Sequence, residues 1–218
     1  MTALIIVAAG RGERLGAAVP KALVEVAGRS LLNRCLDVAR TVPRISQVVV
    51  VAPAGMEGPV RAAVGAAAVT VVEGAATRDG SVRAGLTAVD QHTRDVLVHD
   101  AARPLTPRDV FDRVLDALDE VSAAIPVVPV ADTIKRVHDG VVVETPVRDE
   151  LVAVQTPQGF RTAVLRAAHD ARSGDVTDDA MLVEQSGIQV HVVAGSPLAM
   201  KVTTPFDLAV AAAMLEES

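Results

Sequence analysis

The chain is poor in aromatic residues and in cysteine. Of its 218 residues three are Phe, one is Cys, and none is Trp or Tyr. Proteins that bind single-stranded nucleic acid usually stack the bases on aromatic side chains, so the composition disfavours that function. The lone cysteine, Cys35, excludes an internal disulfide and a zinc site built from cysteines. The single cysteine is typical of a protein of the cytoplasm.

An excess of positive charge and a long apolar run are also missing. Lys and Arg number 21 against 27 Asp and Glu, which gives a net charge of −6, whereas binding to a phosphate backbone needs a basic surface. The first apolar run stops at Gly10, well short of the about 18 residues that cross a bilayer, and no basic segment of a signal peptide precedes it. We therefore expect no nucleic-acid partner, no membrane partner and a cytoplasmic location.

Hydrophobic residues make up 50% of the chain, which predicts a folded core, and its length suits one α/β domain over residues 1–218. Val- and Ile-rich runs alternate with amphipathic stretches. The expected strands are Ala3–Ala8, Gln47–Ala52, Val69–Val72, Asp95–His99, Ala123–Val128 and Gln189–Val193. The expected helices are Leu31–Thr41, Met56–Val64, Ser81–Val89, Thr106–Leu118, Arg161–Ala171, Thr177–Ser186 and Thr204–Glu216. Most of the runs are apolar throughout, as strands covered on both faces are. The alternation predicts a single doubly wound, mainly parallel sheet.

One segment falls outside this alternation. Thr133–Val137 and Val141–Thr145 flank His138-Asp139-Gly140, which predicts a β-hairpin with its turn at Asp-Gly. The hairpin would form an arm at about residues 131–148. Its consecutive valines would be sticky if exposed, so we expect either burial in a homodimer or addition to the edge of the main sheet.

A glycine-rich loop follows the first expected strand. Residues 8–16 read AAGRGERLG and are followed, after three residues, by Pro20 and Lys21. The glycines do not have the G-x-G-x-x-G spacing of dinucleotide-binding proteins, and no G-x-x-x-x-G-K-[ST] P-loop is present. A long loop remains that carries Arg14 and Lys21. Its backbone amides can approach a triphosphate, and the two cations can neutralise a pyrophosphate leaving group.

This loop resembles the A-A-G-x-G-x-R-[LM]-x(n)-P-K pattern of the sugar-nucleotidyltransferase superfamily. Further segments narrow the resemblance: Val98–Pro104, Val130–Lys135, Gln155–Phe160, Thr177–Ala180 and Lys201–Thr203. Together, and in this order, they resemble the 2-C-methyl-D-erythritol 4-phosphate cytidylyltransferase family over nearly the whole chain. Two departures are visible. Ala22 follows Pro-Lys where many members have Gln, and the stretch Gly74–Ser81 has fewer glycines than is usual.

The resemblance implies a Rossmann-like nucleotidyltransferase fold and transfer of CMP from CTP to a phosphorylated polyol, methylerythritol phosphate, with Mg²⁺ as cofactor. It implies CTP binding by Ala8, Ala9, Gly10, Gly12, Arg14, Lys21, Arg78, Ser81, Asp100 and Ala101. It implies polyol binding by Asp100, Arg103, Thr133, Arg148, Thr156, Thr177 and Lys201. The residues expected to act in catalysis are Arg14, Lys21, Arg148 and Lys201. Asp100 is also the candidate ligand of the metal.

Physical chemistry agrees with this assignment. Both substrates are anions, so Mg²⁺ on the triphosphate together with Arg14 and Lys21 would relieve their repulsion. A phosphate monoester is already a nucleophile at neutral pH, and no general base is needed. Asp100 could instead be a helix cap or turn residue, and each threonine could serve a turn or a cap. Thr177 in particular could cap the helix that contains Asp178 and Asp179.

Two other functions remain open at this point. A cytidylyltransferase acting on ribitol phosphate or another polyol phosphate would share the CTP loop and differ in the second pocket. A non-catalytic nucleotide sensor could use the same fold. The presence of Arg14, Lys21, Asp100 and Lys201 disfavours a sensor, which has no pyrophosphate leaving group to stabilise.

Overall fold

A central sheet runs through the computed structural model, which describes residues 1–10, 12, 15–16, 19–171 and 176–216. Its strands are β1 (Thr2–Val7), β4 (Ile45–Ala52), β5 (Thr70–Glu73), β6 (Asp95–Asp100), β7 (Ala123–Pro129), β10 (Val152–Val154), β11 (Gln158–Arg161) and β12 (His191–Ala194). Strands β5, β4, β1 and β6 lie side by side and parallel. Strand β11 is antiparallel to both β6 and β7, and β12 is parallel to β7. The predicted mainly parallel sheet is confirmed, with β10 and β11 as antiparallel strands within it.

Two strands of this sheet that were not predicted, β10 and β11, run in succession along the same side of β7. Val127 of β7 pairs with Val154 of β10 and also with Ala194 of β12, so β10 and β12 lie on opposite sides of β7. Ala124 pairs with Gly159 of β11 and with His191 of β12 in the same way. The chain that returns from the arm therefore enters the sheet between β6 and β7.

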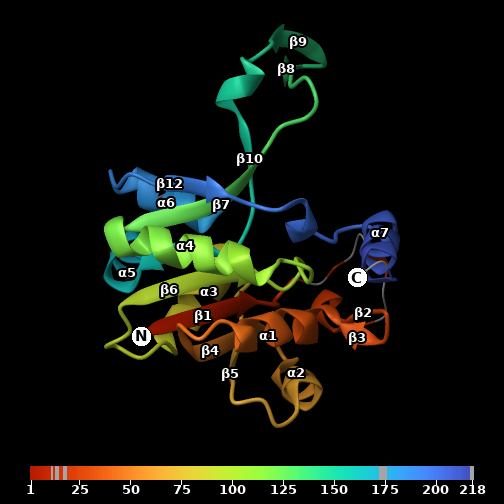
Figure 1. Ribbon diagram of the computed structural model, residues 1–218, viewed down its shortest axis with the longest axis vertical. Helices are drawn as coiled ribbons and strands as arrows, with labels where there is room; N and C mark the ends of the chain where they lie inside the picture. Colours follow the sequence, from red (N-terminus) through yellow and green to blue (C-terminus); the bar gives the residue numbers. More distant parts are fainter. Residues whose placement is uncertain (11, 13–14, 17–18, 172–175, 217–218) are drawn as a thin grey trace.

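Helices cover both faces of the sheet, as the all-apolar strands predicted (Figure 1). The helices on one face are α1 (Leu31–Thr41), α2 (Glu57–Val64) and α4 (Arg108–Glu120). Those on the other face are α3 (Arg78–Thr87), α5 (Thr162–Asp170) and α6 (Asp179–Gln185). Successive residues of β1 alternate between the two cores: Leu4 packs in the first and Ile5 in the second, and both are fully buried. Strands buried on both faces are mostly apolar, because neither face meets water.

A small third core holds the C-terminal helix α7 (Pro205–Glu216) against the hairpin of β2 (Glu25–Val26) and β3 (Arg29–Ser30). The Thr204 hydroxyl accepts a hydrogen bond from the Asp207 amide, and the Asp207 carboxylate accepts from the amides of Thr203 and Thr204. This reciprocal cap fixes the start of α7 immediately after the segment that carries Lys201. Short 3-10 helices, η2 (Lys21–Leu23) and η4 (Pro197–Ala199), precede β2 and Lys201.

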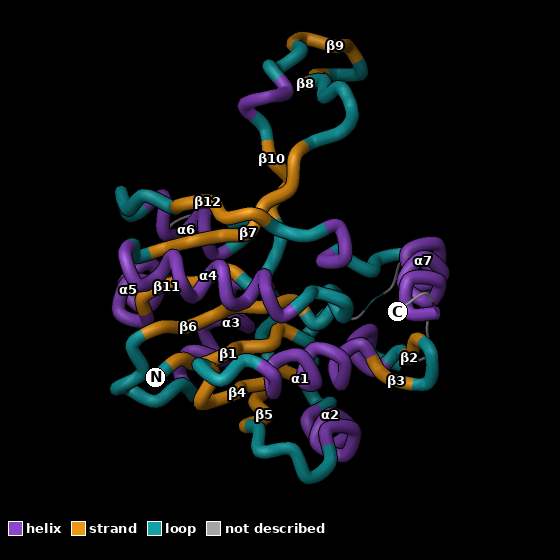
Figure 2. Tube along the Cα trace, in the orientation of Figure 1, coloured by secondary structure: helices purple, strands orange, loops and turns teal. Residues whose placement is uncertain are grey.

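The predicted hairpin is an arm that projects from the sheet (Figures 1 and 2). Strands β8 (Arg136–His138) and β9 (Val141–Glu144) form a two-stranded sheet of their own, so addition to the edge of the main sheet is not what occurs. The turn residues Asp139 and Gly140 have φ of 47° and 77°, as two-residue hairpin turns require. The 3-10 helix η3 (Arg148–Glu150) leads back to β10. Val141, Val142 and Val143 are each more than half exposed.

None of the helices in the described part of the chain combines the length and the apolar character needed to cross a membrane.

Candidate active site

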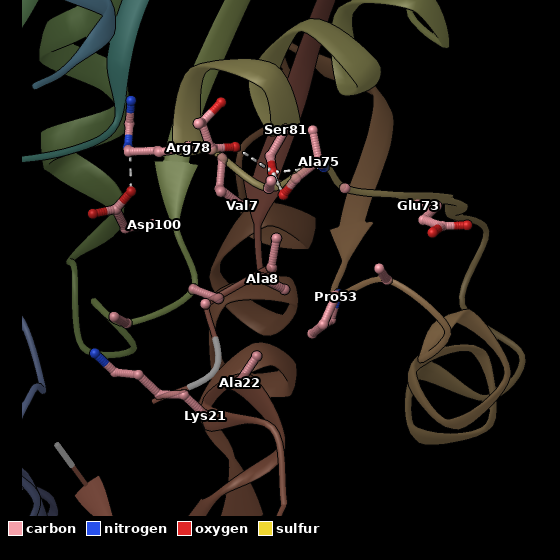
Figure 3. Close-up of a pocket in the computed structure, with 18 of the residues that line it drawn as sticks. Val7, Ala8, Lys21, Ala22, Pro53, Glu73, Ala75, Arg78, Ser81 and Asp100 are labelled. Carbon is pink, nitrogen blue, oxygen red and sulfur yellow. Dashed lines mark hydrogen bonds and ion pairs between the residues drawn. The ribbon is translucent and has the colours of Figure 1, made fainter. Parts of the chain in front are cut away.

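A cavity of about 930 Å³ opens at the carboxyl edge of the parallel strands (Figure 3). The loops that follow β1, β4, β5 and β6 form its walls, and the start of α3 closes one side. Its lining residues are Val7, Ala8, Ala9, Gly10, Lys21, Ala22, Pro53, Ala54, Glu73, Gly74, Ala75, Ala76, Thr77, Arg78, Ser81, Asp100, Ala101, Ala102 and Lys201. Ligands of open α/β sheets bind at this edge, because the loops there are free to diverge while the strands hold them in place.

Asp100, the last residue of β6, lies between two cations. Its Oδ2 is 2.7 Å from Lys201 Nζ, and its Oδ1 is 3.5 Å from Arg78 Nη2. Burial alone would raise the pKa of Asp100, but Arg78 and Lys201 outweigh burial and lower the pKa to about 2. The cavity therefore contains an ionised carboxylate that is more than matched by positive charge.

Arg78 begins α3 and joins the cavity to the core behind it. Its Nη1 donates to Asp179 Oδ2 at 2.7 Å, while Nη2 reaches toward Asp100. Burial would lower the pKa of Arg78, but the carboxylates of Asp179 and Asp100 raise it. The sequence analysis included Asp179 in the motif Thr177–Ala180 but assigned it no role. Asp179 is fully buried in the structure, and this burial, which would have drawn attention to the residue, is not predicted by any local sequence pattern.

Lys201 is held at the cavity by backbone contacts around it. The Val202 amide donates to the Ala102 carbonyl at 2.8 Å, which fixes the chain beside the loop after β6. Arg103 was expected to contact the polyol, but its Nη1 donates to the Ala199 carbonyl at 2.6 Å and its Nη2 to the Val154 carbonyl at 3.1 Å. In this structure Arg103 ties the Lys201 segment to the base of the arm.

Lys21 is placed by the glycine loop. Gly12 has φ of 70°, and a Cβ there would lie 2.5 Å from Lys21 Cβ, so only glycine allows the loop to close against the lysine. In the view of Figure 3, Lys21 extends to the same side of the cavity as Asp100. Arg14, the other cation expected from this loop, lies outside the described residues.

Ser81 shapes the wall formed by the stretch Gly74–Thr77. Its hydroxyl accepts from the Ala75 amide at 3.0 Å and lies 2.9 Å from the Thr77 carbonyl. A Cβ on Gly74 would meet Ala9 Cβ at 2.8 Å, so the loops after β1 and β5 touch at this glycine. Although the stretch Gly74–Ser81 has fewer glycines than is usual in the family, it keeps Gly74, which the close contact with Ala9 requires.

Thr156 supports the site from behind. Its Oγ1 accepts from the Asp100 amide at 3.1 Å and lies 2.9 Å from His99 Nδ1, and all three residues are buried. Burial lowers the pKa of His99 to about 4, so the ring is neutral at physiological pH. Thr156 thus holds the end of β6 and does not line the cavity.

The remaining threonine and arginine predictions fall elsewhere. Thr177 is exposed, with Oγ1 3.7 Å from Met181 Sδ, and the cap of α6 is Asp178, whose Oδ1 accepts from the Met181 amide. The interpretation of Thr177 as the helix cap is therefore wrong. Thr133 and Arg148 lie in the exposed arm. Arg148 donates to the Ala131 carbonyl at 3.2 Å and lines a second hollow of about 430 Å³ at the base of the arm.

The cavity unites most, but not all, of the residues expected from the sequence. It brings together Ala8, Ala9, Gly10, Lys21, Arg78, Ser81, Asp100, Ala101 and Lys201. Outside its lining lie Gly12, Arg103, Thr133, Arg148, Thr156 and Thr177. Most of the residues expected to bind the nucleotide thus line one cavity of this chain, while two of the residues expected to bind the polyol are on the arm.

The cavity lining offers a divalent metal one buried carboxylate, that of Asp100. Among the described residues no group of three His, Cys, Asp or Glu side chains could hold a metal ion. Mg²⁺ commonly uses one or two carboxylates and completes its shell with substrate phosphates and water. Asp100, ionised at the cavity, fits that mode and would act as a ligand only together with a phosphate. Chemically, a cavity lined by Lys21, Arg78 and Lys201 together with this carboxylate suits a polyanionic substrate that carries a cation.

Comparison with known proteins gives a consistent answer. A family model for 2-C-methyl-D-erythritol 4-phosphate cytidylyltransferase matches residues 2–217. A protein of that name from Frankia casuarinae is 51% identical over 98% of this chain and 80% of its own length. The crystal structure of the same enzyme from Thermus thermophilus is similar with a TM-score of 0.84 and 36% identity, covering 99% of this chain and 100% of its own. A 4-diphosphocytidyl-2C-methyl-D-erythritol synthase from Anaerococcus prevotii gives a TM-score of 0.87 at 32% identity, over 99% and 98% of the two chains.

Proposed function

Because the chain belongs to the 2-C-methyl-D-erythritol 4-phosphate cytidylyltransferase family, we propose that the cavity at the carboxyl edge of its sheet is where CTP binds and reacts. The reaction transfers CMP from CTP to 2-C-methyl-D-erythritol 4-phosphate in non-mevalonate isoprenoid synthesis. Its products are 4-diphosphocytidyl-2-C-methyl-D-erythritol and pyrophosphate. The observation that carries the placement is the convergence of Lys21, Arg78 and Lys201 on a cavity whose buried carboxylate, Asp100, is ionised.

The charges of the cavity suggest how the transfer is catalysed. A phosphate oxygen of the polyol substrate attacks the α-phosphorus of CTP, and the bond from that phosphorus to the bridging oxygen of the β-phosphate breaks. The electron pair leaves with pyrophosphate. Lys21, together with Arg14, stabilises the charge that grows on this leaving group. No residue has to remove a proton, because the attacking phosphate monoester is already ionised.

Lys201 has the opposite task of holding the attacking phosphate. Its ammonium lies 2.7 Å from Asp100, so the carboxylate places it at the cavity before substrate arrives. Positioned charges reduce the entropy lost when two anions are brought together in line. Lys201 then keeps the nucleophile near the α-phosphorus throughout the attack.

Mg²⁺ is part of the same proposal. When bound to the triphosphate it would neutralise charge and orient the α-phosphate for in-line attack. Asp100 is the residue of this chain that would hold it, since its carboxylate is ionised and lies in the cavity lining. Arg78 and Lys201, which flank the same carboxylate, would supply positive charge to the phosphates beside the metal.

We further infer that the enzyme is a homodimer in which the arm of one chain completes the polyol site of the other. Thr133 and Arg148, both expected at the polyol, lie on the arm and outside the lining of the cavity of their own chain. Val141, Val142 and Val143 expose apolar surface that a second copy would cover. A cytoplasmic location belongs to the same proposal, because CTP is supplied inside the cell.

Pyrophosphate release tests the function directly. Purified protein with Mg²⁺ and CTP should release pyrophosphate with methylerythritol phosphate, and more slowly with ribitol phosphate. ATP and GTP should be poor replacements for CTP, because a pocket sized for a pyrimidine rejects purines. Faster turnover of ribitol phosphate would overturn the polyol assignment. Binding of CTP without any pyrophosphate release would favour a nucleotide sensor.

A further inference from the structure

Behind the cavity lies a buried carboxylate with one unsatisfied oxygen. Asp179, the first residue of α6, is 0% exposed, and its Oδ2 accepts from Arg78 Nη1 at 2.7 Å. Its Oδ1 has no hydrogen-bond partner among the described residues and lies 3.7 Å from Nε2 of His169, which has none there either. His169 belongs to α5 and is 3% exposed. Arg78, Asp179 and His169 therefore form a line from the cavity into the core, across three helices.

Stability does not explain this arrangement. A buried carboxylate needs more partners than one arginine to offset its lost hydration, and apolar side chains of similar size are usually as good or better. The helix cap does not need Asp179 either, because Asp178 caps α6 through the Met181 amide and also accepts from Gln158 Nε2 at 2.7 Å. Buried polar atoms left without partners call for another reason.

The second guanidinium nitrogen of Arg78, Nη2, which reaches toward Asp100 in the cavity, offers a reason for burying Asp179. An arginine at the rim of an open cavity has many rotamers, and a flexible guanidinium binds phosphate poorly because its freedom must be lost on binding. Asp179 fixes Nη1, which leaves Nη2 directed toward Asp100 and the cavity. His169 lies on the other side of the carboxylate, with Nε2 3.7 Å from Asp179 Oδ1, where its buried ring leaves Asp179 little room to turn away from Arg78.

We propose that Asp179 and His169 are positioning residues that hold Arg78 in place for CTP. The inference rests on the proposed function, in which Arg78 lies in the CTP cavity. Neither residue belongs to the described lining of the cavity, so both act only through Arg78.

Steady-state kinetics on the intact enzyme test the proposal. Asp179→Asn removes the charge that orders Arg78, and His169→Ala removes the side chain behind Asp179. A misplaced binding group costs up to about 10²-fold, so we expect Asp179→Asn to raise the KM for CTP roughly tenfold or more. The kcat should fall less, because ordering of Arg78 matters most for binding. His169→Ala should shift the same constant in the same direction, and His169→Gln, which keeps a donor and most of the volume, should restore it.

Asp95→Asn is a matched control. Asp95 is also a nearly buried carboxylate paired with an arginine, at 2.6 Å from Arg161 Nη1, but it begins β6 whereas Asp100 ends it. The control should lower stability without changing the KM for CTP. If Asp179→Asn behaves like Asp95→Asn, with lower stability and an unchanged KM, Asp179 is only structural and the proposal is overturned.

A double-mutant cycle separates this inference from the function on which it rests. Arg78→Ala should raise the KM for CTP, and adding Asp179→Asn to it should raise the KM no further. If Arg78→Ala leaves the KM for CTP unchanged, the placement of CTP beside Arg78 fails. If Arg78→Ala raises it and Asp179→Asn still adds its own full effect, only the positioning role fails. Should Asp179→Asn not fold, the same cycle with His169→Ala decides the outcome.

Discussion

Acidification should destabilise this fold through one buried side chain, His99. The ring lies beside Phe111 with centroids 5.2 Å apart, its Nδ1 is near the Thr156 hydroxyl, and its Nε2 has no hydrogen-bond partner in the described part of the chain. Burial lowers the pKa of His99 from the ordinary 6.5 to about 4, and the nearby positive charge of Arg103 acts in the same direction. Asp100 acts against this change but does not overcome it.

The sign and size of the effect follow from proton linkage. Between about pH 6.5 and pH 4 the unfolded chain binds a proton at His99 that the folded chain refuses, so stability is complete above pH 6.5 and is lost as the pH falls through this window. At about 1.4 kcal/mol per pH unit, the loss reaches about 2 kcal/mol at pH 5 and roughly 3 kcal/mol in total. That is a large part of the roughly 5–15 kcal/mol by which a typical folded domain is stable.

Urea unfolding at pH 7.5, 6 and 5 measures this loss. Circular dichroism is the suitable probe, since the chain has no Trp and no Tyr. His99→Gln cannot be protonated and should reduce the pH dependence of the unfolding free energy by about 2 kcal/mol over this range. His92→Gln, at an exposed position, should leave the pH dependence as in the wild type. Equal pH dependence in the wild type and His99→Gln would refute the reasoning.

Further predictions concern the site and the arm. Lys21→Ala should lower kcat by about 10²–10³ in a pyrophosphate-release assay with a smaller change in the KM for CTP, and near-normal turnover would contradict the mechanism. Arg148→Ala should raise the KM for the polyol phosphate and reduce kcat, whereas a defect confined to CTP would mean that the wrong substrate was assigned to Arg148. Replacing Val141 and Val143 by Asp should yield a monomer in sedimentation with weaker polyol binding, and a persisting dimer would exclude the arm as its main contact. Removal of Mg²⁺ with EDTA should stop turnover and its return should restore it, while full activity in EDTA would rule out the metal.

Much of the fold could be predicted because its main strands differ sharply from their surroundings. Expected strands such as Asp95–His99 match the observed β6 (Asp95–Asp100) to within a residue, and expected helices such as Leu31–Thr41 match α1. Strands β10 and β11 were not predicted, because Val152–Val154 and Gln158–Arg161 are short and the second is half polar. They form strands because β10 pairs with β7 and β11 pairs with β6 in the folded chain.

The candidate site was likewise predicted in part from local motifs, while the rest depends on contacts between distant segments. Lys21, Asp100 and Lys201 were found from motifs, and the structure places all three at one cavity. The roles of Arg103 and Thr156 were not predictable, since their partners are backbone groups of segments far away in the chain. A motif can identify a residue of the site. It does not show whether the side chain of that residue contacts the substrate or instead supports another side chain that does.

By itself the sequence determined the alternation of strands and helices, the mainly parallel sheet, the arm with its turn and the chemical identity of the nucleotide loop. These are local properties, set by residue size, polarity and spacing over a few turns of backbone. Only the tertiary structure decided that Asp100 meets Lys201, that Arg78 is held by Asp179, and that Arg148 lies away from its own cavity. Such pairs depend on which loops meet when separate elements pack, and packing is a property of the whole chain.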